Sequence, residues 1–300
     1  MSLHAVEVAA HAKANLFLRV LGGEADGYHG IETLFCRLDL ADTLWAERRE
    51  GQGVTVEVTG ADVGPAEANL AVRAAHSVLG ALEHRFAVHL TLTKRIPVGA
   101  GLGGGSADAA AALLAVNRLA GDAVPRHELL QFAARLGSDV PFCLSGAPLA
   151  LGWGRGERML RLPALPPAFG LVLSPAVAIP TAEAYRWVDA ARESAGRRGA
   201  LALDLDALSR WGDIARMAGN DFESPVFARH PEIRSAFEAL VGTHPVVCRM
   251  TGSGSSLLAI YRHAGDREDA QLRLGRKHGV LTPVETAAHP APGPQDVRPG

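Results

Sequence analysis

Five glycines lie within the seven residues 99–105, between two segments of regular pattern. Residues 86–96 alternate apolar and polar side chains, as a strand does, and residues 108–120 have the composition of a helix. Glycines between a strand and a helix let successive backbone N–H groups turn toward one anion, and the positive end of the helix dipole points to the same place. The sequence therefore predicts a phosphate-binding loop over residues 97–107, with Ser106 as the N-cap of the helix.

Two well-known glycine-rich loops do not fit this segment. No Gly-Lys-Ser or Gly-Lys-Thr follows the last glycine, which excludes a P-loop, and no acidic residue lies at the right distance after a following strand, which excludes a dinucleotide-binding loop. A flexible linker or a tight turn is the alternative interpretation. It is disfavoured because the glycines lie directly between a strand and a long helical segment.

The loop resembles the second motif of the GHMP kinases, a family of small-molecule kinases that wrap ATP phosphates with a Pro-x-x-x-Gly-Leu-Gly loop. Its third consecutive glycine, Gly105, and the following Ser-x-Asp-Ala-Ala are similar to one branch, whose substrate carries a cytidine diphosphate group. A serine is often found in the family where this chain has Ala107. The ATP-binding residues that the resemblance implies are Pro97, Val98, Gly99, Ala100, Gly101, Leu102, Gly103, Gly104, Gly105, Ser106 and Ala107. Asn69 matches a family segment beside the adenine, although it is equally suited to cap a helix.

A lysine interrupts the apolar strand predicted over residues 12–18. On the residues alone, a solvated lysine on an edge strand is the favoured interpretation, because lysines are rarely buried without a partner. The Ala-Lys-x-Asn-Leu pattern resembles the opening strand of the kinase branch, which implies that Lys13 is catalytic. The same resemblance implies that Asn15 orients polar groups at the substrate.

Asp139 precedes a Val-Pro-Phe sequence, which is typical of a helix start. Capping of that helix by the carboxylate is one interpretation. The segment Gly-Ser-Asp-Val-Pro-Phe is also similar to the one that supplies the catalytic aspartate of the branch. The resemblance implies that Asp139 is the general base and that Lys13 stabilises charge on the transferred phosphoryl group.

Residues 22–29 are rich in turn formers and predict a hairpin loop. Their Asp-Gly-Tyr-His sequence is similar to the acceptor motif of the branch, which implies that Tyr28 stacks on cytosine and that His29 reads its edge. Without the resemblance, both would be ordinary surface side chains of a turn. The other substrate-binding residues that the resemblance implies are Thr181, Tyr185, Gly252 and Ser253.

The motif order implies an α+β fold of two domains, with the active site in the cleft between them. We expect an ATP-binding domain over residues 1–154, a substrate-side domain over residues 155–286 and a disordered, Pro- and Ala-rich tail over residues 287–300. The Gly-Trp-Gly-Arg-Gly segment at residues 152–156 has the character of a hinge between the two domains.

The implied reaction is transfer of the γ-phosphoryl group of ATP, with Mg²⁺, to the C2 hydroxyl of 4-diphosphocytidyl-2-C-methyl-D-erythritol. Ser106 is the best candidate for a protein ligand of the ion, which is otherwise held by phosphates and water. Two alternatives stay open: another GHMP kinase of the homoserine or mevalonate type, and a non-catalytic sensor that retains the fold.

Composition limits the other partners. The formal net charge is −2, so no broad basic face indicates a nucleic acid, and the 300 residues contain no apolar run long enough to span a membrane. The three cysteines are far apart and lack the spacing of a zinc site. We expect a cytoplasmic enzyme with free thiols, while the oligomeric state stays open.

Overall fold

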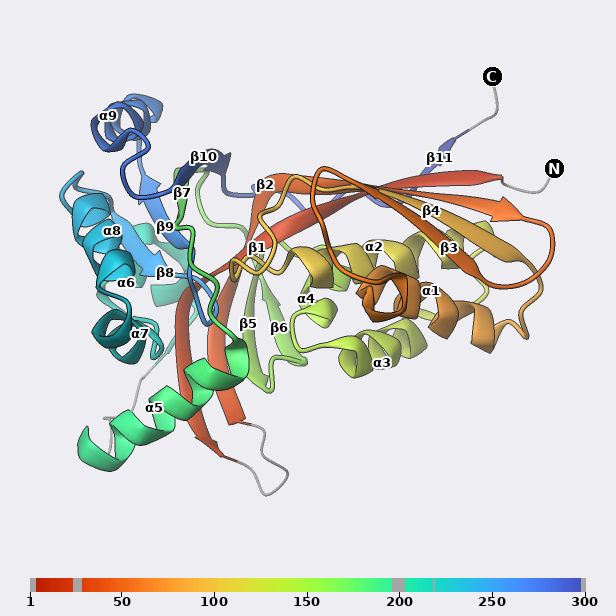
Figure 1. Ribbon diagram of the computed structural model, residues 1–300, viewed down its shortest axis with the longest axis horizontal. Helices are drawn as coiled ribbons and strands as arrows, with labels where there is room; N and C mark the ends of the chain where they lie inside the picture. Colours follow the sequence, from red (N-terminus) through yellow and green to blue (C-terminus); the bar gives the residue numbers. More distant parts are fainter. Residues whose placement is uncertain (1–3, 24–28, 196–202, 218, 298–300) are drawn as a thin grey trace.

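The computed structural model describes residues 4–23, 29–195, 203–217 and 219–297. Two sheets form the framework, and helices cover one face of each (Figure 1). The α+β class predicted from the sequence is confirmed. In Figure 1 the helices of the N-terminal half lie under the right part of the larger sheet, and the C-terminal elements gather at the left.

The larger sheet consists of β1 (Ala5–Gly23), β2 (His29–Arg49), β3 (Val54–Thr59), β4 (Ala87–Thr93), β5 (Leu149–Gly154), β6 (Arg158–Leu162) and β11 (Gln295–Val297). The smaller sheet has the order β10-β7-β9-β8, with β7 (Phe169–Ser174), β8 (Val247–Met250), β9 (Leu257–Tyr261) and β10 (Val280–Glu285). The helices are α1 (Leu70–Ala81), α2 (Gly104–Leu119), α3 (Arg126–Leu136), α4 (Val140–Ser145), α5 (Thr181–Ala195), α6 (Trp211–Arg216), α7 (Glu223–Arg229), α8 (Pro231–Val241) and α9 (Ala264–Leu274), with short 3₁₀ turns at Ala66–Ala68 and Ala207–Ser209.

Two long antiparallel strands, β1 and β2, connect the two halves of the molecule (Figure 1). Their pairing extends to Gly23 and His29, which confirms the hairpin predicted around residues 22–29. One end of β2 pairs with β4 and the other end pairs with β5. The β1–β2 ribbon therefore carries residues of its middle section, Lys13 among them, between the glycine loop and the C-terminal elements.

Small side chains bring α2 close to the larger sheet. The helix buries a long row of alanines, and these belong to the same apolar cluster as Val88, Leu90 and Leu92 of β4. Because alanine adds little bulk between helix and strand, α2 packs closely on β1 and β2 of this sheet. The start of the helix is joined to the end of β4 by an ion pair between Asp108 and Lys94. The predicted strand-loop-helix unit is thus confirmed.

The boundary predicted at residue 154 lies inside a hairpin. Strand β6 pairs antiparallel with β5, and the Gly156 N–H donates to the Trp153 carbonyl oxygen across the turn at 3.2 Å. Gly154 and Gly156 have positive φ values of 73° and 110°, as a tight turn requires. The glycines that suggested a hinge serve a β-turn instead, and the chain enters the smaller sheet only at β7.

The prediction of a disordered tail is wrong for residues 287–297. We call residues 286–297 the C-terminal strap, because they run back from β10 across the larger sheet. The Ala291 N–H donates to the Gly146 carbonyl oxygen at 2.8 Å, and β11 pairs antiparallel with β1. The exposed edge of β1 offers unpaired backbone groups, and these outweigh the weak structural preference of a Pro-rich segment. Residues 298–300 lie outside the described part.

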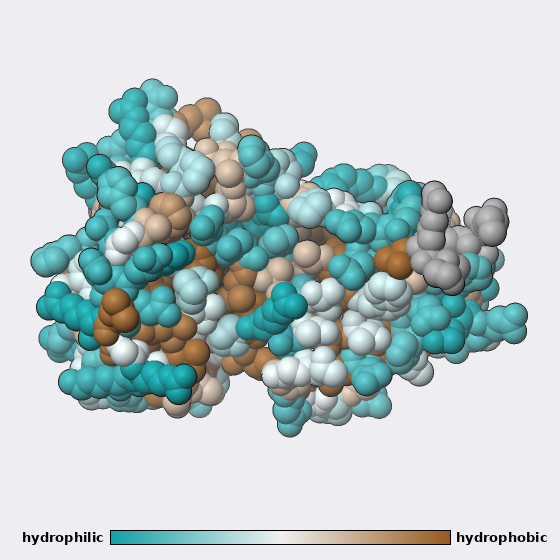
Figure 2. All heavy atoms as spheres, turned by 90° about the horizontal axis from the view of Figure 1, so that it is seen from above, coloured by the Kyte–Doolittle hydropathy of each residue, from teal (hydrophilic) through white to brown (hydrophobic). Residues whose placement is uncertain are grey.

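Within the described ranges, no helix combines the length and the apolar character that crossing a membrane demands. Figure 2 shows hydrophilic side chains over most of one face, with small groups of hydrophobic residues exposed toward the C-terminal elements.

Candidate active site

The glycine loop takes a conformation that only glycine adopts readily at three of its positions. Gly99, Gly101 and Gly103 have φ values of 69°, 78° and 71°. Gly103 is the N-cap of α2, and the helix begins at Gly104. The prediction that Ser106 caps the helix is therefore wrong: Ser106 is the third helical residue, because the glycines themselves make the turn into the helix.

Neighbouring groups leave no room for a side chain at Gly101 or Gly103. A Cβ on Gly101 would lie 2.2 Å from the Thr251 carbonyl oxygen, and a Cβ on Gly103 would lie 2.9 Å from Cγ of Lys13. The loop is thus pressed against β1 on one side and against the segment after β8 on the other. Its backbone, together with the N-terminus of α2, forms a concave surface suited to phosphate oxygens.

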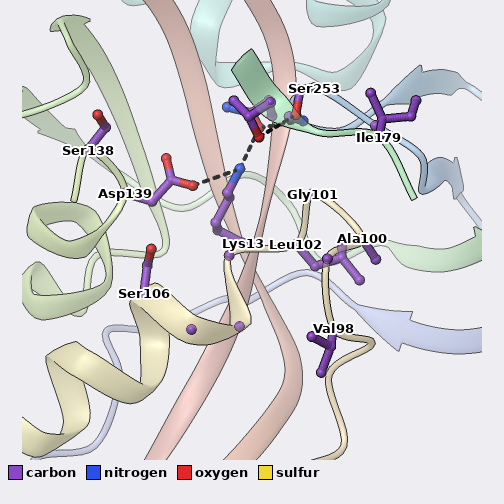
Figure 3. A pocket seen from close by; sticks show the side chains of 18 of the residues that line it. Lys13, Val98, Ala100, Gly101, Leu102, Ser106, Ser138, Asp139, Ile179 and Ser253 are labelled. Atoms are coloured by element: carbon purple, nitrogen blue, oxygen red, sulfur yellow. Dashed lines mark hydrogen bonds and ion pairs between the residues drawn. The ribbon is translucent and has the colours of Figure 1, made fainter. Parts of the chain in front are cut away.

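Lys13 and Asp139 form an ion pair beside this loop (Figure 3). The Lys13 Nζ lies 3.1 Å from Asp139 Oδ2, and the two side chains are 3% and 28% exposed. The interpretation of Lys13 as a solvated edge lysine is wrong, because its side chain is buried and its backbone N–H donates to the Leu102 carbonyl oxygen of the glycine loop. Asp139 is the N-cap of α4 by position, but its side chain makes no capping hydrogen bond. The carboxylate is turned toward Lys13 instead.

Asn15 holds the lysine from the other side. Its Oδ1 accepts from Lys13 Nζ at 2.8 Å and from the Gly252 N–H at 2.9 Å, while its Nδ2 donates to Thr33 Oγ1 at 2.8 Å. Asn15 is 1% exposed, and these protein partners occupy its amide. Asn15 therefore fixes the position of Lys13 and of the loop that contains Gly252. It also borders the cavity, and its role in substrate binding stays a prediction.

Aromatic side chains gather at the far end of the cavity. The rings of His29 and Tyr185 stack with centroids 4.7 Å apart, and Phe222 meets Tyr185 edge-on at 5.0 Å. Burial raises the pKa of Tyr185 to about 12, and the negative charge of Asp139 adds to this rise. Tyr185 was predicted to stack on the base together with Tyr28. The latter lies outside the described residues.

The remaining sequence predictions have separate outcomes. The Thr181 and Ser253 hydroxyls lie 3.0 Å apart and bring the start of α5 to the loop after β8. Asn69 accepts from the Ala71 N–H at 2.9 Å, which confirms it as a helix cap, and it also borders the cavity.

Ala107 does not line this cavity, and its prediction as an ATP contact is wrong. It is 1% exposed and packs in the apolar cluster under α2, because position 107 of the helix faces inward.

The candidate site is a cavity of about 1130 Å³. It extends from Asn69 and the glycine loop, past Lys13 and Asp139, to His29 and Tyr185 near α5. Figure 3 shows Lys13 and Asp139 facing each other inside it, with Ser106 at the start of α2. Its walls come from both halves of the molecule. The expected interdomain position of the site is therefore confirmed.

Sequence reasoning missed a buried charge cluster below the loop. Lys94, which follows β4 directly, forms ion pairs with Asp42 of β2 and with Asp108 of α2, the latter at 2.6 Å. Burial raises the pKa of Asp108 to about 7, and the charge of Asp42 adds to the rise while Lys94 opposes it. The cluster fastens the strand end to the helix that begins at the glycine loop. The only sequence signal for this cluster was the presence of charged residues directly beside apolar segments.

Three other residues were also missed, because each acts through a distant partner. Asn220 donates to the carbonyl oxygens of Met250 and Gly252, both at 2.7 Å. The Thr251 hydroxyl donates to the Gly101 carbonyl oxygen at 3.2 Å, and Asp189 binds His29. In the parts of the chain that the structure describes, no group of three or more His, Cys, Asp or Glu side chains is placed to hold a metal ion.

Comparisons with known proteins agree with this architecture. The model of the GHMP kinases N terminal domain matches residues 69–147, and that of the GHMP kinases C terminal matches residues 202–281. A 4-diphosphocytidyl-2-C-methyl-D-erythritol kinase from Solibacter usitatus is 42% identical over 84% of this chain and 80% of its own length. A relative with the same name from Bordetella parapertussis is 39% identical over 95% of this chain and 91% of its own.

Solved structures show the same fold. A crystal structure of 4-(cytidine 5'-diphospho)-2C-methyl-D-erythritol kinase matches with a TM-score of 0.78 at 35% identity, and the match covers 93% of this chain and 98% of that one. A homoserine kinase from Cytophaga hutchinsonii matches with a TM-score of 0.73 over 97% and 96% of the two chains. Its identity is 19%, so this second likeness concerns the fold alone.

Proposed function

The chain belongs to the GHMP kinases and, within them, to the 4-diphosphocytidyl-2-C-methyl-D-erythritol kinases, and we propose that it transfers the γ-phosphoryl group of ATP to the C2 hydroxyl of that alcohol. It is a small-molecule phosphotransferase that uses ATP. The observation that carries the proposed residue roles is the Lys13–Asp139 ion pair, which lies in one cavity with the glycine loop.

The glycine loop is suited to hold the ATP phosphates. A Cβ at Gly101 or Gly103 would collide with neighbouring atoms, and the glycines of the loop line the cavity, so the loop presents backbone there without side chains. The first residues of α2, up to Ser106, add the positive end of the helix dipole. We propose that Mg²⁺ accompanies the nucleotide and neutralises phosphate charge. Ser106 is the candidate protein ligand of this ion.

Asp139 is proposed as the general base. Its carboxylate is partly exposed to the cavity and accepts the proton of the substrate hydroxyl as the oxygen bonds to phosphorus. Lys13 keeps the carboxylate oriented, and its positive charge stabilises the oxygens of the phosphoryl group during transfer. Asn15 prevents the lysine side chain from changing rotamer, because it accepts from Nζ. Positioning and electrostatics thus supply most of the catalysis.

The aromatic end of the cavity is proposed to bind the cytosine. Tyr185 and His29 offer stacked ring surface there, and the family resemblance adds Tyr28 as a second stacking partner. Stacking of a base on an aromatic side chain is worth roughly 1 to 3 kcal/mol. A substrate that carries a base at one end and an alcohol at the other matches a cavity that extends from the rings to Lys13 and Asp139.

The alternatives receive less support. Homoserine kinase shares the fold at low identity, but neither homoserine nor mevalonate would use the stacked rings. A non-catalytic sensor would have no need for a buried lysine paired with a carboxylate in the phosphate-binding cavity. The cytoplasmic location stays a prediction.

The decisive experiment measures ATP consumption with Mg²⁺ and each of three alcohols: the cytidine diphosphate methylerythritol, homoserine and mevalonate. We expect turnover with the first alone. Lys13→Met, a neutral side chain of similar length, serves as the inactive control that excludes contaminating kinases. Turnover with another alcohol would overturn the substrate assignment. If ATP is consumed with none of the three alcohols, the non-catalytic sensor is favoured.

A further inference from the structure

His29 is bound through its Nε2 to a carboxylate of the C-terminal half of the molecule. This nitrogen lies 2.9 Å from Oδ1 and 2.8 Å from Oδ2 of Asp189, which projects from α5. The His29 side chain is 10% exposed and the carboxylate is 46% exposed. Both residues border the cavity at the end where Tyr185 lies. The bond thus joins the start of β2 to α5 across the region proposed for the base.

The carboxylate decides which nitrogen of His29 carries the proton. An ionised aspartate only accepts hydrogen bonds, so Nε2 must donate, and in the neutral imidazole the other nitrogen, Nδ1, is then a bare acceptor. The Tyr185 ring, stacked at 4.7 Å, holds the plane of the imidazole, and the bond to Asp189 fixes which edge of the ring carries Nε2. In its neutral form, His29 therefore offers an acceptor, and no donor, at Nδ1.

The two pyrimidine bases differ at the group that such an acceptor can distinguish. Cytosine carries an exocyclic amine, which donates, where uracil carries a carbonyl oxygen, which accepts. An acceptor placed against the uracil oxygen leaves two lone pairs facing each other, and both groups lose their hydrogen bonds on burial.

We propose that Asp189 is the positioning residue that makes the site select cytosine over uracil, by holding His29 with its proton on Nε2. This inference rests on the proposed function and adds a determinant of its base specificity. Asp189 binds His29, which stacks on Tyr185 at the end of the cavity proposed for the base, so we expect its effect to be confined to base recognition. An asparagine at this position can donate or accept, and it permits both tautomers of the imidazole.

The kinetic test compares kcat/KM for the cytidine and uridine forms of the diphospho-methylerythritol substrate. For the wild-type enzyme we expect a preference for cytidine of about 100-fold or more. Asp189→Asn should reduce the preference at least about tenfold, through a higher KM for the cytidine form and better use of the uridine form, with kcat changed less than about threefold. Glu183→Gln, which removes an exposed charge from the same helix, is the matched control and should leave the preference unchanged.

A spectroscopic test reads the tautomer directly. The ¹⁵N shifts of the His29 ring in the wild-type protein should report a protonated Nε2 and a bare Nδ1, and Asp189→Asn should give a mixture. An unchanged preference and an unchanged tautomer in Asp189→Asn would overturn the inference while the kinase function stands. Absence of turnover with either substrate in the wild-type protein would instead overturn the proposed function, and the ¹⁵N shifts would still test the role of Asp189.

Discussion

The Thr251 carbonyl oxygen lies so close to Gly101 that a side-chain carbon at residue 101 would stand only 2.2 Å from it. This contact joins the glycine loop of the N-terminal half to the loop after β8 in the C-terminal half. Gly101→Ala should therefore separate the two loops, because backbone atoms on both sides have to move and φ is 78°. We expect the KM for ATP to rise more than about tenfold.

Gly99→Ala is the control for that substitution. Gly99 has a similar φ of 69°, but no atom lies within 4 Å of the place that a Cβ would take there. Only the backbone penalty of about 1 kcal/mol applies at this residue. Steady-state kinetics with varied ATP would separate the two, and equal effects of both substitutions would contradict the role given to the Gly101–Thr251 contact.

Asp139→Asn should abolish turnover and leave nucleotide binding intact. The amide cannot accept the hydroxyl proton, yet it has the shape of the carboxylate and can still contact Lys13. We expect kcat to fall by about 10³-fold or more, in line with the loss of a general base. Calorimetric titration of an ATP analogue should give a dissociation constant close to that of the wild-type protein. Substantial activity in this variant would remove the base assignment.

Asn15→Ala should affect both catalysis and stability. Lys13 Nζ and the Gly252 N–H lose their shared acceptor inside the protein, and the free energy of unfolding should fall by about 1 to 3 kcal/mol. The loosened lysine should lower kcat about tenfold. Thr33→Val removes the acceptor of the Asn15 Nδ2 but leaves Lys13 bound, so it should lower stability with a much smaller effect on kcat. Urea denaturation and initial rates measure the two quantities.

Asp108 should make the stability of the protein depend on pH. Its pKa rises from about 4 in the unfolded chain to about 7 in the folded protein, mainly because of burial. Between these values the folded state holds a proton that the unfolded state has lost, so the free energy of unfolding falls as pH rises from about 4 to about 7 and levels off above. In Asp108→Asn this contribution is absent. Urea denaturation at several pH values should show a shallower slope for the variant, and parallel curves would contradict the prediction.

Removal of residues 287–300 should lower the melting temperature by roughly 5 °C or more. The truncation unpairs the edge of β1 and opens a small cavity of about 130 Å³ between α4 and the C-terminal strap. Arg118→Gln removes only exposed ion pairs, those with Asp122 and Asp296, so it should have little effect on the melting temperature. Scanning calorimetry of both variants distinguishes a strap held by backbone pairing from one held by surface charge.

The local features of this chain were readable from its sequence. Alternation predicted β4, alanine content predicted α2, and the glycines between them predicted a phosphate loop, because each depends on neighbours within a few residues. The helix start was misplaced at Ser106, since a left-handed glycine, Gly103, can begin a helix without a side-chain cap. The glycines of residues 152–156 were assigned to a hinge for a similar reason, because hinge and hairpin turn use the same residue.

By itself, the sequence determined the α+β class, the order of the motifs and the groups that we propose to carry the phosphotransfer: a lysine, an aspartate and a glycine loop. Tertiary structure alone decided which partners these groups have. Asp139 turns to Lys13 rather than to its own helix, and the strap pairs with the free edge of β1 rather than staying in solvent. The bond between Asp189 and His29 joins residues 160 positions apart. Such contacts depend on how distant segments meet in space, and no pattern of neighbouring residues encodes them.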